Sequence, residues 1–290
     1  MFLNRLFAAP RVLLAVSCLL AASVALGQGV DNPAVFELDG NTQVSSSKDW
    51  ESTFAAGTPK TLIPIQDPAP NSIYTGGGSK DTNDVSQWKH KDGSVPDKDD
   101  IRQAAAVALP LPNGNLAIYF TATRFANNGD AQVGFWFFQK KVTPQPDGTF
   151  GPAPGQIANH ENGDLLVLVN FEGGGLTPSI QVYQWQGGVN GGPVLVSAGL
   201  KVGQCGTGPN AGNHDVCAIT NAGDSNAPAS WGYEPKAGTA GVFPAQTFFE
   251  GAVNLSVIFG AGNVPCFSSF IAETRSSSSI TAQLKDFAEG

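Results

Sequence analysis

Positive charge is scarce in this sequence of 290 residues. Lys and Arg number 16 against 24 Asp and Glu, which gives a formal net charge of −8. Nucleic acids and anionic lipid surfaces are bound by basic faces, so this balance disfavours both as partners. Charged residues amount to 14% and there is one methionine, whereas glycine (35) and proline (20) are plentiful. This composition is typical of an exported all-β protein.

Long hydrophobic runs are missing after residue 27. The apolar run at 12–26 follows Arg5 and Arg11 and ends in a small-x-small cleavage pattern, so we expect residues 1–27 to be a cleaved signal peptide. The alternative is a membrane anchor, but a span needs roughly 20 apolar residues. Loss of the two arginines would change the net charge from −8 to −10. The expected location is secreted or cell surface, with no membrane span after cleavage.

Common catalytic motifs are absent as well. The sequence contains neither a Gly-x-Ser-x-Gly elbow nor a His-Glu-x-x-His zinc motif. Three histidines stand alone in polar stretches, and we expect each to be exposed: His90, His160 and His214. No nucleophile or general base is therefore indicated.

Two carboxylates in strand-like sequence keep a glycosidase open as an alternative. Glu250 and Glu273 could flank a substrate, because glycosidases use two carboxyl groups across a cleft. Alternation equally allows each to face solvent or to pair with Arg275 or Arg124. For Arg124, which lies near Asp130, a structural ion pair is favoured over a substrate clamp.

Cysteines are few, and their number is odd once the signal peptide is removed. Cys18 would leave with the signal, and Cys205, Cys217 and Cys266 remain. In an oxidising compartment we expect Cys205 and Cys217 to form a disulfide that closes a loop rich in Gly and Asn. The alternative is a zinc site that adds His214 and lacks a fourth ligand. We expect the partner of Cys266 to lie beyond the sequence given.

Strand-like runs dominate what is present. Residues 116–121 and 131–138 are apolar and rich in β-formers, and Asn127-Asn128-Gly129-Asp130 between them supplies turn residues, so we expect a central antiparallel hairpin. Large side chains on both faces of 131–138 predict that this strand is covered on both sides.

Further runs are separated by turns rather than by amphipathic helices. We predict a single domain, residues 28–290, built as an antiparallel β-sandwich or jelly roll with long irregular loops at about 76–100 and 201–246. Residues 255–259 are expected to form a helical turn capped by Asn254, and 101–109 a short helix or a strand. The other expected strands are 35–38, 164–169, 179–185, 194–196, 246–254, 267–274 and 279–287.

The loop at 76–100 is the most polar stretch, with six aspartates and four lysines. Calcium takes 6 to 8 oxygen ligands, and irregular loops supply them well. A solvated loop neutralised by its lysines is the open alternative, because the complete EF-hand pattern is absent. The candidate calcium ligands are Asp81, Asn83, Asp84, Asp97, Asp99 and Asp100, with Asp130 from the predicted hairpin turn.

Tryptophans are the candidates for stacking on a sugar. Trp136 lies in a strand that is apolar on both faces, and its expected place is the core. Trp88 and Trp231 stand in polar loops, where an indole face could bind a glycan or plug the edge of a core.

Three motifs occur in an order that resembles known sandwiches. FELDGN at 36–41 with Asp49-Trp50, the stretch 127–138, and FEGAVNL at 249–255 resemble the carbohydrate-binding modules of family nine and related DOMON-type β-sandwiches. GGGSKDTNDVSQWK at 76–89, FANNGDAQVGFWFFQ at 125–139 and CFSSFIAETRSS at 266–277 look like a family of uncharacterised exported bacterial surface proteins. The resemblance implies a sandwich fold and an exported address, and no activity.

These observations favour a secreted or cell-surface, non-catalytic module with a structural or adhesive role, stabilised by calcium. A carbohydrate-binding module and a polysaccharide-processing enzyme are the alternatives. The expected partners are glycans or other envelope proteins.

Overall fold

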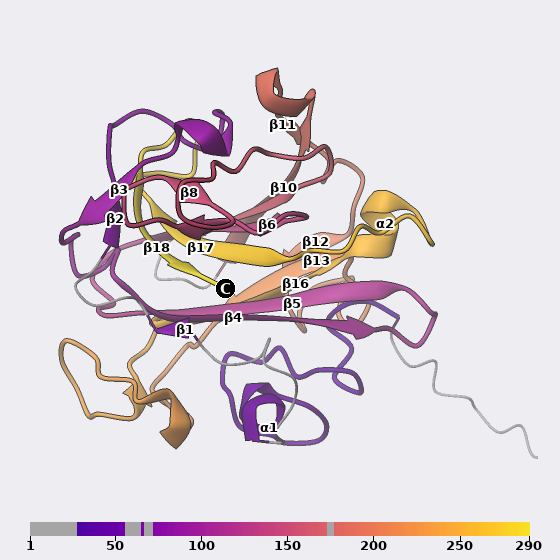
Figure 1. The fold of residues 1–290 in the computed structure, drawn as a ribbon. Helices are drawn as coiled ribbons and strands as arrows, with labels where there is room; N and C mark the ends of the chain where they lie inside the picture. The colour runs from indigo at the N-terminus through magenta and orange to yellow at the C-terminus, as the bar shows by residue number, and fades with distance from the viewer. Residues whose placement is uncertain (1–27, 56–64, 67–71, 173–176) are drawn as a thin grey trace, which may run out of the picture.

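The computed structural model describes residues 28–55, 65–66, 72–172 and 177–290. Two large sheets pack face to face, and loops cover the outer side of each (Figure 1). The predicted all-β sandwich is thus confirmed. The predicted signal peptide lies outside the described residues.

The first sheet has six strands in the order β1-β4-β5-β16-β13-β12. Neighbours are antiparallel except β12 and β13, which run parallel. Its strands are β1 (Ile65–Gln66), β4 (Ile101–Pro110), β5 (Leu116–Arg124), β16 (Phe248–Asn254), β13 (Val216–Thr220) and β12 (Val202–Gln204).

The second sheet has eight strands in the order β11-β10-β9-β6-β17-β18-β2-β3, all antiparallel. They are β11 (Gly192–Leu195), β10 (Thr177–Gln186), β9 (Leu165–Glu172), β6 (Ala131–Phe138), β17 (Ser269–Arg275), β18 (Leu284–Glu289), β2 (Ser72–Tyr74) and β3 (His90–Asp92). Two short ribbons pair β7 (Thr143–Pro144) with β8 (Phe150–Gly151) and β14 (Ser225–Asn226) with β15 (Val242–Phe243).

Helical structure is brief. In the described residues the helices are α1 (Trp50–Ala55) and α2 (Leu255–Phe259), with 3₁₀ turns η2 (Val85–Gln87), η3 (Gly188–Asn190) and η4 (Ala229–Trp231). Asn254 caps α2 by accepting a hydrogen bond from the Val257 amide, as its sequence position predicts. None of the helices in the described ranges is long and apolar enough to cross a membrane.

The predicted central hairpin is wrong. β5 pairs with β4 and β16, whereas β6 pairs with β9 and β17, so the chain crosses from one sheet to the other between them. The rings of Phe120 and Phe135 meet across the sandwich, with centroids 4.5 Å apart. Both strands bury side chains on both faces, and an arch between two sheets satisfies that requirement as well as a hairpin does.

Three apolar cores result from this layering. The inner core lies between the sheets and includes Phe120, Phe135 and Phe137. One outer core lies between the six-stranded sheet and the segment that carries α1, and the other between the eight-stranded sheet and the loop at 76–100. The prediction that β6 is covered on both sides is therefore confirmed.

Two further expectations are decided by the backbone. Residues 101–109 form a strand, because they pair along β5 for almost their whole length. Residues 35–38 are not a strand, and Phe36, Glu37 and Leu38 are all buried rather than alternating. This segment packs on the outer face of the six-stranded sheet without joining its hydrogen bonds.

Candidate cation site

The segment before α1 holds a group of carboxylates against the six-stranded sheet. Phe36 anchors it: its ring centroid lies 4.9 Å from that of Trp50 and 4.8 Å from that of Tyr119 on β5. The intervening chain turns back on itself, and the Glu37 amide donates to the Lys48 carbonyl at 2.8 Å. The two ends of the segment are thereby brought together.

Three carboxylates meet where the segment turns. Glu37, Asp39 and Asp49 each offer an oxygen, and these oxygens lie within 4.8 Å of one another. Glu37 and Asp49 are buried, whereas Asp39 is exposed. In the part of the chain that the structure describes, this is the one group of three or more His, Cys, Asp or Glu side chains close enough to hold a metal ion. We call it the cation site.

Glu37 is held as an anion by the serines that follow it. Its carboxylate accepts hydrogen bonds from the amides of Ser45, Ser46 and Ser47 and from the hydroxyls of Ser45 and Ser46. Burial alone would raise the pKa of Glu37, but these donors lower it to about 2.

Asp49, in contrast to Glu37, is poorly supplied with hydrogen-bond donors. Its Oδ1 accepts from the Trp50 amide, and within the described residues no donor bonds Oδ2, although the side chain is fully buried. Burial, together with the negative charges of Asp39 and Glu37, raises the pKa of Asp49 to about 8. A buried carboxylate oxygen without a partner is costly, and a cation would satisfy it.

Glu250 on β16 holds the segment that carries the cation site against the six-stranded sheet. It accepts from the Gly40 amide at 2.6 Å and from the Trp50 indole at 2.8 Å, and so fixes both ends of the turning segment. Gly40 has φ +83°, and a Cβ there would lie 3.0 Å from the Thr220 carbonyl oxygen, so this position requires glycine. Burial and the charge of Asp49 raise the pKa of Glu250 well above its ordinary value.

The site opens to solvent through Asp39. This residue also lines an open polar cleft of about 500 Å³, together with Asn41, Gln43, Asp224 and Asn226. A cation at the site would therefore have protein oxygens on its buried side and water on its open side.

No family model, curated protein or solved structure matches this chain. The resemblance to exported surface proteins thus stays a prediction.

The predicted calcium ligands of the 76–100 loop are not brought together. Asp81 is fully buried and contacts Arg275 and the Trp136 indole. Asp84 accepts from the amides of Ser86 and His160. Neither belongs to a group of three or more such side chains close enough to hold a metal ion among the described residues.

The remaining candidate ligands of that set are also dispersed. The Asn83 carbonyl accepts from the Trp88 indole, and Asp97 forms a surface pair with Lys236. Asp99 and Asp100 are buried beside the start of β4, whereas Asp130 is exposed. Among the described residues, these side chains do not converge on one point where a calcium ion could bind.

The two candidate sugar-stacking tryptophans are buried. Trp88 is 0% and Trp231 1% exposed, in the two different outer cores. Neither presents a ring face to solvent. Their loops fold back over the sheets, and the indoles fill the space beneath, which is the alternative that the sequence left open.

The cysteines form the predicted disulfide between Cys205 and Cys217, and Cys266 is exposed and free. The zinc alternative is therefore excluded, since both thiolates are consumed. His214 is buried and its Nδ1 lies 2.7 Å from Asp31. The expectation that His214 is exposed is wrong because this pairing satisfies the ring inside the protein.

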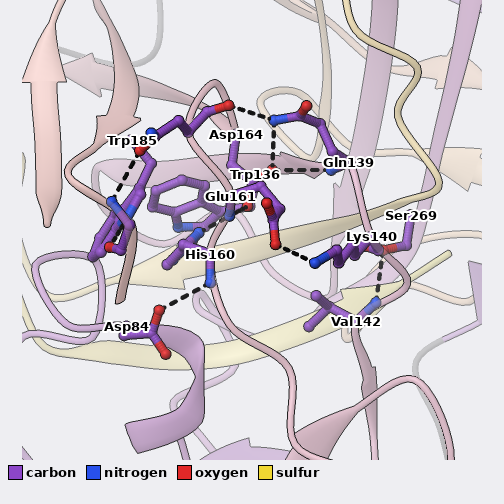
Figure 2. Close-up of polar contacts among 12 residues, drawn as sticks. Asp84, Trp136, Gln139, Lys140, Val142, His160, Glu161, Asp164, Trp185 and Ser269 are labelled. Atoms are coloured by element: carbon purple, nitrogen blue, oxygen red, sulfur yellow. Dashed lines mark hydrogen bonds and ion pairs between the residues drawn. The ribbon is translucent and has the colours of Figure 1, made fainter. Parts of the chain in front are cut away.

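His160 is likewise buried rather than exposed. Its ring stacks on Trp185 with centroids 4.0 Å apart, and its Nδ1 lies 3.1 Å from Asp164 Oδ2 (Figure 2). The backbone amide donates to Asp84, so the residue ties the polar loop to the sheet. His90 is partly buried, with Nε2 3.0 Å from the Gln145 carbonyl.

The two strand carboxylates cannot flank one substrate. Glu250 belongs to the outer core of the six-stranded sheet, and Glu273 lies beneath the loop on the eight-stranded sheet, so the whole sandwich separates them. Glu273 pairs with Arg275, one of the predicted alternatives. Arg124 is structural, but it bonds the carbonyls of Gln246 and Gly129 rather than Asp130.

Sequence reasoning missed the cation site. Its residues stand in the FELDGN and Asp49-Trp50 motifs, which drew notice only as a resemblance. The acidic-Gly turn followed nine residues later by Asp-Trp was the available signal. A strand at 35–38 does not by itself bring Asp49 to Glu37 and Asp39, because that contact depends on how the chain between them turns.

Proposed function

We propose that this chain is a non-catalytic β-sandwich module of the cell surface or secreted fraction, with a structural or adhesive role, and that it binds one calcium ion at the cation site. The observation that carries the proposal is Asp49 Oδ2, a buried carboxyl oxygen beside Glu37 and Asp39 that no donor among the described residues bonds. The ion would fix the segment before α1 on the six-stranded sheet.

The donor set favours calcium over other metals. All three side chains offer oxygen, which suits calcium and magnesium, whereas zinc sites usually include sulfur or nitrogen. Calcium accepts irregular geometry with 6 to 8 ligands, and water can supply the rest at the exposed side of Asp39. Magnesium needs a near-ideal octahedron, which a surface turn provides less readily.

An exported address is supported by the disulfide. Cys205 and Cys217 are bonded, and such bridges persist in oxidising compartments. There, calcium is a common stabiliser of extracellular modules. Other envelope proteins are the partners that we propose for the structural role.

Thermal unfolding of the purified protein with calcium, and then with chelator, tests the proposal. A ligand at a hundred times its dissociation constant stabilises the folded state by about 2.7 kcal/mol, which corresponds to a rise in melting temperature of about 5–10 °C. Asp39→Asn should lose most of this rise, because it removes one ligand charge at the exposed side of the site. Asp92→Asn, an exposed carboxylate on β3, is the matched control and should keep it.

Isothermal titration supplies the independent measurement. We expect one calcium per chain for the wild type and for Asp92→Asn, and strongly weakened binding for Asp39→Asn. Coincident melting curves of the wild type with calcium and with chelator would contradict the proposal. So would a calcium response that Asp39→Asn retains in full.

A further inference from the structure

A second hollow lies at the end of the sandwich where β6 and β10 stop, beside the end of α2. It has a volume of about 530 Å³, within the range of ligand-binding clefts. None of its lining residues is charged. Five of them carry a side-chain amide: Gln139, Asn162, Gln184, Gln186 and Asn263. We call it the amide cleft.

The amides replace apolar side chains where the two sheets end. Along β6 the inward positions are apolar up to Phe137, and the next inward position is Gln139. Along β10 they are apolar up to Val182, and Gln184 and Gln186 follow. The inner core is thus closed at this end by polar groups that can bind hydrogen-bonding ligands.

An aromatic ring closes the other side of the cleft. Phe259, at the end of α2, is partly exposed and lines it together with Pro265. A Cβ built on Gly163 would lie 3.2 Å from Gln139 Nε2 and 3.5 Å from Phe259 Cε1. The amide of one sheet and the ring from the other therefore flank the same glycine.

The floor of the cleft is fixed before any ligand arrives. Gln139 donates from its side chain to the Asn162 carbonyl at 2.8 Å and from its backbone to Asp164 at 2.9 Å (Figure 2). The Asn162 side-chain oxygen accepts from the amides of Gly187 and Gly188, both at 2.9 Å. Asp164 is itself held by the buried His160, so the planes of these amides are preorganised.

Hydrogen-bonding groups remain available in the cleft. Within the described residues, no protein group bonds the side-chain oxygen of Gln139, the amino group of Gln184 or the side-chain amide of Asn263. Both acceptors and donors are therefore available to a ligand or to water. A planar amide offers a donor and an acceptor side by side, which matches a pair of neighbouring hydroxyl groups.

We propose that the amide cleft binds a neutral oligosaccharide. Its sugar hydroxyls would bond the amides, and the apolar face of a ring would pack on Phe259. The absence of charged lining residues and the net charge of −8 disfavour an acidic polysaccharide. This inference rests on the proposed adhesive role and names its ligand. The amide cleft shares no residue with the cation site, so sugar binding should not depend on calcium.

The first test is affinity electrophoresis of the purified protein through gels that contain barley β-glucan, xylan, galactomannan, dextran or alginate. The second is a glycan array of neutral and acidic oligosaccharides. We expect retardation in at least one neutral polysaccharide and none in alginate, and the same preference on the array. Gln184→Ala and Phe259→Ala should each weaken binding at least tenfold.

Two matched variants separate binding from folding. Gln181→Ala lies on the same strand outside the cleft, and Val257→Ala lies on the exposed side of α2; both should bind as the wild type does. The Phe259 ring also packs on the inner core. If Phe259→Ala lowers the melting temperature for that reason, the binding measured for Gln184→Ala alone tests the proposal. Absence of binding to every neutral glycan, binding to acidic glycans only, or full binding by Gln184→Ala overturns the proposal. Asp39→Asn and chelator should leave sugar binding unchanged, so failure of the calcium proposal is seen separately.

Discussion

Arg275 is shared by two carboxylates inside the protein. It forms an ion pair with Asp81 from the polar loop, and its guanidinium lies 3.0 Å from Glu273 Oε1. All three side chains are at most 1% exposed. One positive charge cannot neutralise two carboxylates. Burial and the charge of Asp81, opposed by Arg275, therefore raise the pKa of Glu273 well above its ordinary value of 4.5.

This pKa shift predicts how stability depends on pH. Above pH 4.5 the unfolded chain releases a proton that native Glu273 keeps, so the contribution of Glu273 to the free energy of unfolding falls as the pH rises. Glu273→Gln imitates the protonated form and removes this dependence. Urea unfolding at pH 5 and pH 8 should show a smaller loss of stability for the variant than for the wild type.

Glu161→Gln is the control for that measurement. Glu161 pairs with Lys140 on the surface, so its removal should leave the wild-type difference between the two pH values. An equal loss of stability in Glu273→Gln and the wild type would show that Glu273 is already ionised in the native protein.

At the scale of elements, the polar loop at 76–100 is a structural layer. Trp88 packs on Trp136 and Phe150, with ring centroids 6.1 and 5.9 Å away. Its indole donates to the carbonyls of Lys80 and Asn83. The loop thus folds around one buried indole, and its Asp81 and Asp84 accept hydrogen bonds from protein donors.

Strand positions were largely predictable from alternation, but strand pairing was not. The sequence of β5 and β6 demands cover on both faces, and a hairpin and an arch provide it equally. The helical turn after Asn254 and the bond between Cys205 and Cys217 were predictable because each depends on local chemistry. The cation site was not, since it depends on how an irregular segment turns.

The amide cleft escaped prediction for a related reason. Its glutamines continue the inward alternation of β6 and β10, and the sequence does not mark where the two sheets stop facing each other. Phe259 comes from a helix that follows a strand of the other sheet. Only tertiary packing brings these residues to one place.

The disulfide should stabilise the edge formed by β12 and β13. Cys205 follows β12 and Cys217 lies within β13, and the two are separated by 12 positions in the sequence. A bridge that closes a loop of this size typically contributes about 2–4 kcal/mol. Replacement of both cysteines by serine should lower the free energy of unfolding, measured with urea, by about this amount.

Cys266→Ser is the comparison for the double variant. Cys266 is exposed, so its replacement should change stability by no more than about 0.5 kcal/mol. A double variant as stable as the wild type would show that the bridge does not stabilise this edge.

In the whole molecule, tryptophan marks the outer layers. All five tryptophans lie in the two outer cores: Trp50 and Trp231 on the six-stranded sheet, and Trp88, Trp136 and Trp185 on the eight-stranded sheet. Fluorescence therefore reports the loops packed on the sheets, whereas circular dichroism reports the strands.

The two signals should change together during unfolding. The outer layers share strands with the inner core, since β6 buries Phe135 inward and Trp136 outward. Urea titrations followed by fluorescence and by far-ultraviolet circular dichroism should give one midpoint, as a cooperative unit requires. An earlier fluorescence transition would show instead that the loops detach while the sheets persist.

The loop layers also constrain how this chain can diverge. Surface connections normally absorb insertions and deletions, because little depends on their length. Here the stretch around Trp88 carries a buried indole and the partner of Arg275, so a change of one residue in its length would displace both. We therefore expect relatives to preserve the length of this loop more strictly than that of the turn at Asn113-Gly114, whose two residues are exposed.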